Sequence, residues 1–130
     1  MAMEINRPDV LAEMNAVFQR YEQALVTNDV VTLDGLFWQS PHTVRYGITE
    51  DLYGYAAIAA FRKARSPLNL ARTLRNTVIT TFGEDYATTA TEFLRPPGTA
   101  IGRQMQTWVR TEADWRVVAA HVSLLPVDGP

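Results

Sequence analysis

The hydrophobic period of this chain changes once, near Arg72, and this change constrains the fold more than any other feature. Before Arg72 the apolar residues recur at intervals of three and four, which is the spacing of a buried helix face. After Arg72 they alternate with Thr and other polar residues, which is typical of strands. Helices that precede a run of antiparallel strands predict an α+β fold, in which the helices pack on one curved sheet.

Three helices are predicted before Arg72. The first begins near Pro8, which suits the first helical turn, and Asp9 favours the positive end of the helix dipole. Residues 30–37 and 55–64 are predicted to form two shorter helices. The apolar stripe of the first helix consists of Val10, Met14, Val17, Phe18, Tyr21, Ala24 and Leu25.

A short strand is predicted at residues 43–46, and four longer strands follow Arg72. The longer strands run over residues 72–82, 86–94, 102–110 and 115–124, with hairpin turns at 83–85 and 111–114. Side chains two positions apart in a strand lie on the same face. Arg72 therefore shares a face with the apolar residues Leu74 and Val78, and need not point to water.

Composition excludes several classes of function. The 130 residues suffice for one domain with a hydrophobic core, expected to span residues 1–130. The net charge is -2 without a Lys/Arg run, which argues against a nucleic-acid partner. With no apolar stretch near the roughly 18 residues of a membrane span, and no signal peptide, we expect a cytoplasmic protein without membrane contact. Cys is absent, and His42 and His121 lack metal-ligand spacing, so no metal site is expected.

Arg45 is the unusual residue of the short strand at 43–46. An Arg in so short a strand extends to water, pairs with a carboxylate such as Glu50 or Asp51, or points into a cavity and binds an anion. We favour the last alternative, with a small carboxylated substrate as the anion. Tyr21 lies on the buried helix stripe, where its hydroxyl requires a partner. The structural alternative for Tyr21 is a core residue bonded to a backbone carbonyl.

Two further groups of polar residues are catalytic candidates. His121 and Ser123 alternate in one strand, but no carboxylate is identifiable to complete a triad, so we expect them on the convex, interface side. Parity places Trp115 and Val117 on that same face. Glu92 is the only acidic residue within its strand, and a salt bridge is favoured over a catalytic base.

Motifs along the whole chain resemble a known family. In order they are LFW, TVRYG, LYGY before a helix, FGEDYATTATEF, GRQMQTWVR and WRVVAAHVSL. They resemble the SnoaL-like, or nuclear-transport-factor-two-like, proteins. VRYGITEDLYGY together with GRQMQTWVR is similar to the AtzH-type proteins and to the HpxZ-type proteins of oxalurate catabolism. The resemblance implies a cone-shaped, curved antiparallel sheet wrapped around the N-terminal helices, as in ketosteroid isomerase.

The narrower resemblance implies a cofactor-free decarboxylating amidohydrolase. Such an enzyme converts 1,3-dicarboxyurea to allophanate in cyanuric acid (s-triazine) catabolism, beside a biuret-type amidase. The functional Tyr and Arg of this branch match Tyr21 in QRYEQAL and Arg45 in TVRYG. Arg45 would hold a carboxylate through two parallel hydrogen bonds. Tyr21 would supply the proton that the urea nitrogen or oxygen receives as carbon dioxide leaves.

A substrate with two carboxylates requires a second cation, for which we expect Arg72. In the strand at 102–110, Gln104, Gln106 and Trp108 share one face. By analogy with the fold we expect that face to line the pocket, although a bulge at Gly102 would invert it. Trp38 is also expected to contact the substrate.

The sequence leaves the oligomer and two rival functions open. We expect a homodimer that packs through the outer face of the sheet. One rival is a ketosteroid-isomerase-like isomerase, which requires a buried carboxylate base, and only Glu92 is available. The other is a non-catalytic ligand-binding or assembly partner of an amidase, because the fold alone does not specify an activity.

Overall fold

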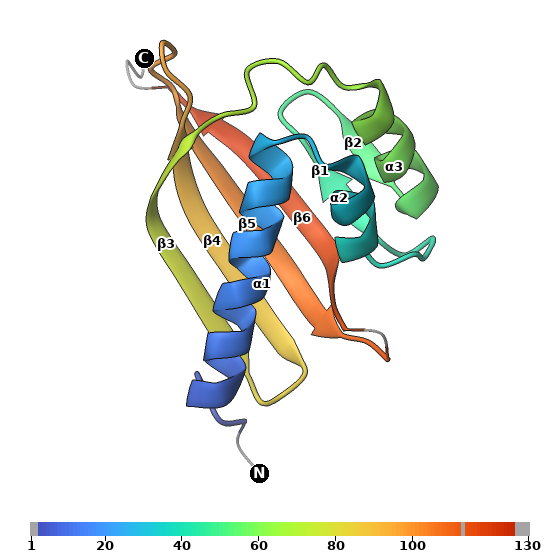
Figure 1. Cartoon of the computed structure of the whole chain (residues 1–130), viewed down its shortest axis with the longest axis vertical. Coiled ribbons are helices and arrows are strands. Elements are labelled where there is room, and N and C mark those ends of the chain that lie inside the picture. Colours follow the sequence, from blue (N-terminus) through green and yellow to red (C-terminus); the bar gives the residue numbers. More distant parts are fainter. Residues whose placement is uncertain (1–2, 113, 127–130) are drawn as a thin grey trace.

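Figure 1 shows a computed structural model of the chain, which describes residues 3–112 and 114–126. Within these residues three helices pack on one six-stranded sheet. The helices are α1 (Pro8–Val26), α2 (Val30–Leu36) and α3 (Tyr55–Ala64). The strands are β1 (Val44–Tyr46), β2 (Asp51–Tyr53), β3 (Thr73–Phe82), β4 (Tyr86–Leu94), β5 (Ile101–Arg110) and β6 (Trp115–Leu125).

The sheet has the strand order β2-β1-β6-β5-β4-β3, and only the β1–β6 pair is parallel among the pairs described. The α1 helix lies across the concave face of the sheet, and α2 and α3 lie beside β1 and β2 (Figure 1). The connection from α3 to β3 crosses the end of the sheet near the C-terminus of α1 (Figure 1). The α+β fold with a curved sheet and N-terminal helices is therefore confirmed.

The predicted stripe of α1 is its buried face. All seven predicted stripe residues are buried, and six of them, all except Phe18, meet Trp108, Trp115 and Val117 of the sheet in the hydrophobic core. Helix α2 begins after Asn28, whose φ is 54°, and Asp29 caps it by accepting a hydrogen bond from the Thr32 backbone N–H (3.2 Å). This tight turn brings the second helix back beside the first.

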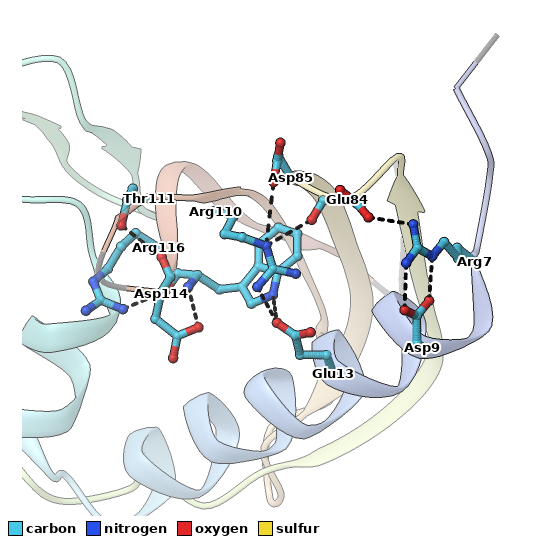
Figure 2. A network of polar contacts seen from close by, with 10 residues as sticks. Arg7, Asp9, Glu13, Glu84, Asp85, Arg110, Thr111, Asp114 and Arg116 are labelled. Atoms are coloured by element: carbon cyan, nitrogen blue, oxygen red, sulfur yellow. Dashed lines mark hydrogen bonds and ion pairs between the residues drawn. The ribbon is translucent and has the colours of Figure 1, made fainter.

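A polar network fixes the N-terminal half of α1 to the far end of the sheet (Figure 2). Glu13 accepts hydrogen bonds from Arg110 and from the indole Nε1 of the buried Trp115 (2.8 Å). Arg7 bonds Asp9 in its own helix and Glu84 in the β3–β4 turn (Figure 2). These contacts hold the N-terminal half of α1 on the sheet. The C-terminal half of α1 forms one wall of a cavity.

The predicted face of β3 is wrong beyond its middle. Between Arg75 and Val78 the pairing with β4 shifts, and Asn76 has a φ of 52°. A bulge of this kind inverts the side-chain alternation that follows it. Val78 is therefore 58% exposed, whereas Ile79 packs against the core and Thr81 is buried.

The predicted common face of β6 is also wrong. Thr107 pairs with Ala119 but Trp108 pairs with Val117, so one extra residue stands in β6. As a result Trp115 and Val117 are buried, whereas His121 is exposed on the convex side. The pattern also missed β2, which pairs with β1 at the edge of the sheet. None of the described helices has the length and apolar character needed to cross a bilayer.

Candidate active site

A cavity of about 350 Å³ lies between the C-terminal half of α1, the sheet and α3. Its charged lining residues are Arg45, Glu50, Arg65, Arg72 and Arg95. Tyr21 from α1 and Gln104 from β5 add a hydroxyl and an amide. A recess of about 10 Å³ shares Tyr21, Arg45 and Arg65 with this cavity and has room for about one water molecule. The chemistry of the lining suits a small anion.

The structure places the Tyr21 ring in the core and its side chain against the cavity. The ring is 6% exposed, perpendicular to Trp108 at 6.1 Å and tilted to Phe37 at 6.4 Å between centroids. Among the residues that the structure describes, the Tyr21 hydroxyl makes no hydrogen bond. Packing therefore fixes the ring and leaves the hydroxyl available to a ligand.

Arg45 lines the same cavity and lies on β1, the strand between β2 and β6. Its side chain is 15% exposed, and its guanidinium lies 5.6 Å from the centre of the Phe61 ring. Its nearest carboxylate is Glu50, at 3.4 Å. Because charge-assisted bonds to guanidinium are usually about 2.7–2.9 Å, this contact leaves hydrogen-bonding capacity free for a ligand.

Glu50 is folded back over its own turn. A Cβ atom at Gly47 would lie 1.9 Å from the Glu50 Oε1 atom, so a larger residue there would displace this carboxylate. Thr49 donates to Glu50 from its backbone N–H (3.2 Å) and its hydroxyl (3.1 Å). The turn therefore holds a carboxylate beside Arg45.

Arg72 lines the cavity but already has an anionic partner. Its side chain is 1% exposed and donates two hydrogen bonds to Glu22, at 2.9 and 2.6 Å. It also donates to Gln104 Oε1 (3.1 Å) and lies 4.6 Å from the centre of the Phe93 ring. The predicted second cation is thus brought to the site, with its charge neutralised by Glu22.

The predicted concave face of β5 is confirmed, since Gln104, Gln106 and Trp108 are 3%, 2% and 0% exposed. Only Gln104 among them lines the cavity. Gln106 and Trp108, which were also predicted to contact the substrate, lie outside the cavity lining. Thr89 donates to Gln106 Oε1 (3.0 Å) and accepts from Trp108 Nε1 (3.1 Å). Trp108 is covered by α1, where it supports the ring of Tyr21.

Trp38, also predicted to contact the substrate, does not line this cavity. Adjacent residues of an extended segment point to opposite sides, and Phe37 takes the buried side at 1% exposed. Trp38 consequently lines a separate surface hollow with Gln39 and Arg116, and stacks on His42 at 6.2 Å between ring centroids.

Sequence reasoning missed Arg65 and Arg95. Arg65 follows the last residue of α3, and Arg95 follows the last residue of β4, so periodicity gives no information on where they point. Burial lowers the pKa of each guanidinium below its usual value. One signal was available, because 11 of the 12 basic residues of the chain are Arg, the residue that recognises carboxylates in a fixed plane.

Glu92, the carboxylate required by the isomerase alternative, points away from the cavity. It lies on the outer face of β4 and accepts a hydrogen bond from Arg75 (2.8 Å), as the salt-bridge interpretation predicted. The Arg75 guanidinium lowers the pKa of this carboxyl below its usual value. Glu92 is therefore not a base for a ligand in this cavity.

Comparison with known proteins gives a family model and a set of solved structures. A model described as AtzH-like matches residues 3–128. A protein of unknown function from the DUF3225 family of Pectobacterium atrosepticum is 58% identical, with a TM-score of 0.93 over 94% of this chain and 95% of that one. A cystatin-like fold protein from Burkholderia xenovorans is 50% identical, with a TM-score of 0.92 over 96% and 98%.

A more distant structure shares the fold alone. It is a nuclear transport factor 2-like superfamily protein from Salmonella enterica, 23% identical, with a TM-score of 0.73 over 93% of this chain and 94% of that one. No curated protein sequence matches the chain.

Proposed function

Because this chain belongs to the AtzH-like family, we propose that it is a cofactor-free decarboxylating amidohydrolase that converts 1,3-dicarboxyurea to allophanate. One observation carries the proposal. The Tyr21 and Arg45 side chains, which match the functional pair of the branch that the motifs resemble, line one cavity together. That cavity is rich in guanidinium groups and has the volume of a small-molecule site.

The proposed reaction removes one carboxylate as carbon dioxide. The bond between the carboxylate carbon and its urea nitrogen breaks, and the electron pair remains on nitrogen. One proton is taken up, so the dianion gives the monoanion allophanate and carbon dioxide. The Tyr21 hydroxyl, which has no competing partner among the described residues, supplies that proton. The recess beside it offers space for a water that restores the proton.

Arg45 orients the substrate in this proposal. Its fork binds one carboxylate in a fixed plane, so the reacting bond is held near the Tyr21 hydroxyl. The buried aromatic rings around Tyr21 limit its movement and exclude water from its ring edge. Positioning and one proton transfer suffice for a substrate that loses carbon dioxide readily.

The test is turnover of freshly prepared 1,3-dicarboxyurea, followed as allophanate and carbon dioxide release. Tyr21→Phe and Arg45→Gln are expected to lower kcat/KM by about 10²-fold or more. Matched controls are Tyr86→Phe and Arg103→Gln, since both residues are exposed on the outer face of the sheet. Melting temperatures check that all variants are folded.

Two outcomes would contradict the proposal. If the wild-type protein does not accelerate the reaction, the enzyme is excluded, and a stable complex with an amidase would favour the assembly alternative. If turnover occurs at an unchanged rate in both active-site variants, Tyr21 and Arg45 have no part in it.

We also propose a homodimer that forms through the convex face. Five strands contribute one row of directly paired residues, Val78, Ala90, Met105, His121 and Tyr46. Val78 and Met105 are each 58% exposed and Tyr46 is 37% exposed. An exposed row of this kind across the centre of a sheet is typical of a surface that a partner covers.

A further inference from the structure

The four arginines of the cavity differ in whether a carboxylate neutralises them. Arg72 is bonded to Glu22, and Arg45 contacts Glu50. Neither Arg65 nor Arg95 has a carboxylate within ion-pair distance among the residues that the structure describes. The cavity therefore carries two positive charges without a counter-charge from the described part of the chain.

Both of these guanidinium groups leave a buried donor without an acceptor. The Nε atoms of Arg65 and Arg95 are inaccessible and have no hydrogen-bond partner among the described residues. One long contact, from Arg65 Nη2 to Asn28 Oδ1 at 3.5 Å, and one aromatic contact, from Arg95 to Phe93 at 4.9 Å, accompany them. Desolvated charges without a counter-charge are costly, so an anion bound in the cavity beside these guanidinium groups would recover free energy.

A third unpaired buried donor belongs to another residue that lines the cavity. Gln104 is 3% exposed, and its Oε1 atom accepts from Arg72, which fixes the orientation of the amide. The Nε2 atom at the other end of that amide is buried and has no partner among the described residues. Gln104, Arg65 and Arg95 all line the one cavity.

We infer that Arg65, Arg95 and Gln104 form a second anion subsite, which binds the second carboxylate of a dicarboxylate whose first carboxylate is held by Arg45. The inference rests on the proposed function, and it names the substrate class as a dianion with two carboxylates on a short chain. It also assigns Arg72 a different role from the one expected, because Arg72 orients Gln104 and is neutralised by Glu22.

This subsite gives the cavity a preference that follows from charge. A dianion pairs with both Arg45 and the Arg65–Arg95 subsite. A monoanion of similar size leaves one of these two groups unpaired. Since the proposed reaction converts a dianion to a monoanion, the same subsite weakens the hold on the product.

Binding of stable probes tests the inference without any turnover. Glutarate has two carboxylates on a five-carbon chain, and butyrate has one. Titration calorimetry of the wild-type protein is expected to show that glutarate binds at least about 10-fold more tightly than butyrate. One additional charge-assisted hydrogen bond accounts for a difference of this size. Arg65→Gln and Arg95→Gln are expected to reduce that ratio to about threefold or less, while Arg95→Lys retains more of it than Arg95→Gln and Arg103→Gln leaves it unchanged.

The inference is overturned if the wild-type protein binds the two probes equally, or if the ratio persists in both Gln variants. Melting curves identify any variant that does not fold, and the other position then decides the outcome. Failure of the enzyme proposal looks different. If the preference for glutarate depends on Arg65 and Arg95 but the protein does not turn over 1,3-dicarboxyurea, the subsite inference stands and the enzyme proposal is excluded. If both Gln variants turn over 1,3-dicarboxyurea with an unchanged KM, the enzyme proposal stands and the subsite inference is excluded.

Discussion

At the scale of single residues, the choice of Arg over Lys determines the character of the cavity. Arg72 and Arg95 both lie over the Phe93 ring, at 4.6 and 4.9 Å from its centre, and a planar guanidinium stacks there better than an ammonium. Burial lowers the pKa of Arg65 and Arg95, yet a guanidinium begins from a value so high that it stays charged. The guanidinium groups of Arg65 and Arg95 therefore keep their charge near neutral pH.

The Glu13 carboxylate predicts a pH dependence of stability. Its hydrogen bond from Arg110 lowers the pKa of this carboxyl below 4.5, with Trp115 adding to the effect. A pKa lowered by folding means that ionised Glu13 stabilises the fold above about pH 4.5, and that this contribution is lost as the pH falls through the folded-state pKa. Glu13→Gln keeps an acceptor for the Trp115 indole but loses the charge.

Because the Glu13 side chain is 43% exposed, solvent screening limits the expected destabilisation of Glu13→Gln at pH 7 to about 1 kcal/mol or less. Urea denaturation of both proteins at pH 7 and pH 3 measures it. The difference in unfolding free energy should shrink at pH 3, and a difference that grew on acidification would contradict the assignment.

At the scale of elements, periodicity predicted the helices and most strand limits, and it failed at bulges. The α1 stripe and the bounds of α3 and β4 are confirmed because each element keeps one period from end to end. Val78 and Val117 were placed on the wrong faces because one extra residue reverses the alternation, and no residue type in β6 announces it. β2 was missed because three residues are too few for a period.

The close packing of β4 on β5 predicts the effect of one methyl group. A Cβ atom at Gly102 would lie 2.1 Å from Phe93, a buried ring that also supports Arg72 and Arg95. Gly102→Ala is therefore expected to destabilise the protein by about 1–3 kcal/mol and to weaken glutarate binding. Gly35→Ala is the control, since nothing lies within 4 Å of its Cβ position and Ala favours the helix.

Thermal melting and glutarate titration of both glycine variants check this expectation. If Gly102→Ala melts and binds like the wild-type protein, Phe93 has room to move and does not position the arginines. If Gly35→Ala loses binding to the same extent, the effect is not specific to the cavity.

At the scale of the whole molecule, the site depends on contacts between distant parts of the chain. Tyr21 and Arg45 were found through motifs, and their meeting in one cavity required the β1–β6 pairing that no local pattern encodes. Arg65 and Arg95 follow the ends of α3 and β4, and only the path of the chain between α3 and β3 brings them together. Sequence therefore predicted the fold and two of the four lining arginines, and the remainder follows from tertiary structure.

The convex face predicts a change of molecular mass. Met105→Asp places a charge at the centre of the exposed row, where its burial between two copies would be costly. Light scattering after size exclusion is expected to give a dimer for the wild-type protein and a monomer for the variant. The fold of the monomer should persist because Met105 is 58% exposed. An unchanged dimer would exclude this face as the interface.

The turn that holds Glu50 beside Arg45 has a consequence for the resting protein. An empty guanidinium cavity attracts any anion in its surroundings, from phosphate to chloride. Here the carboxylate of Glu50 lies beside Arg45. It is close enough to contact the guanidinium but, at 3.4 Å, too far to hold it firmly. A ligand carboxylate at Arg45 competes with this side chain, and an anion that also bonds a second guanidinium competes better. The Glu50 side chain thus competes with weakly bound anions for Arg45 in the resting protein.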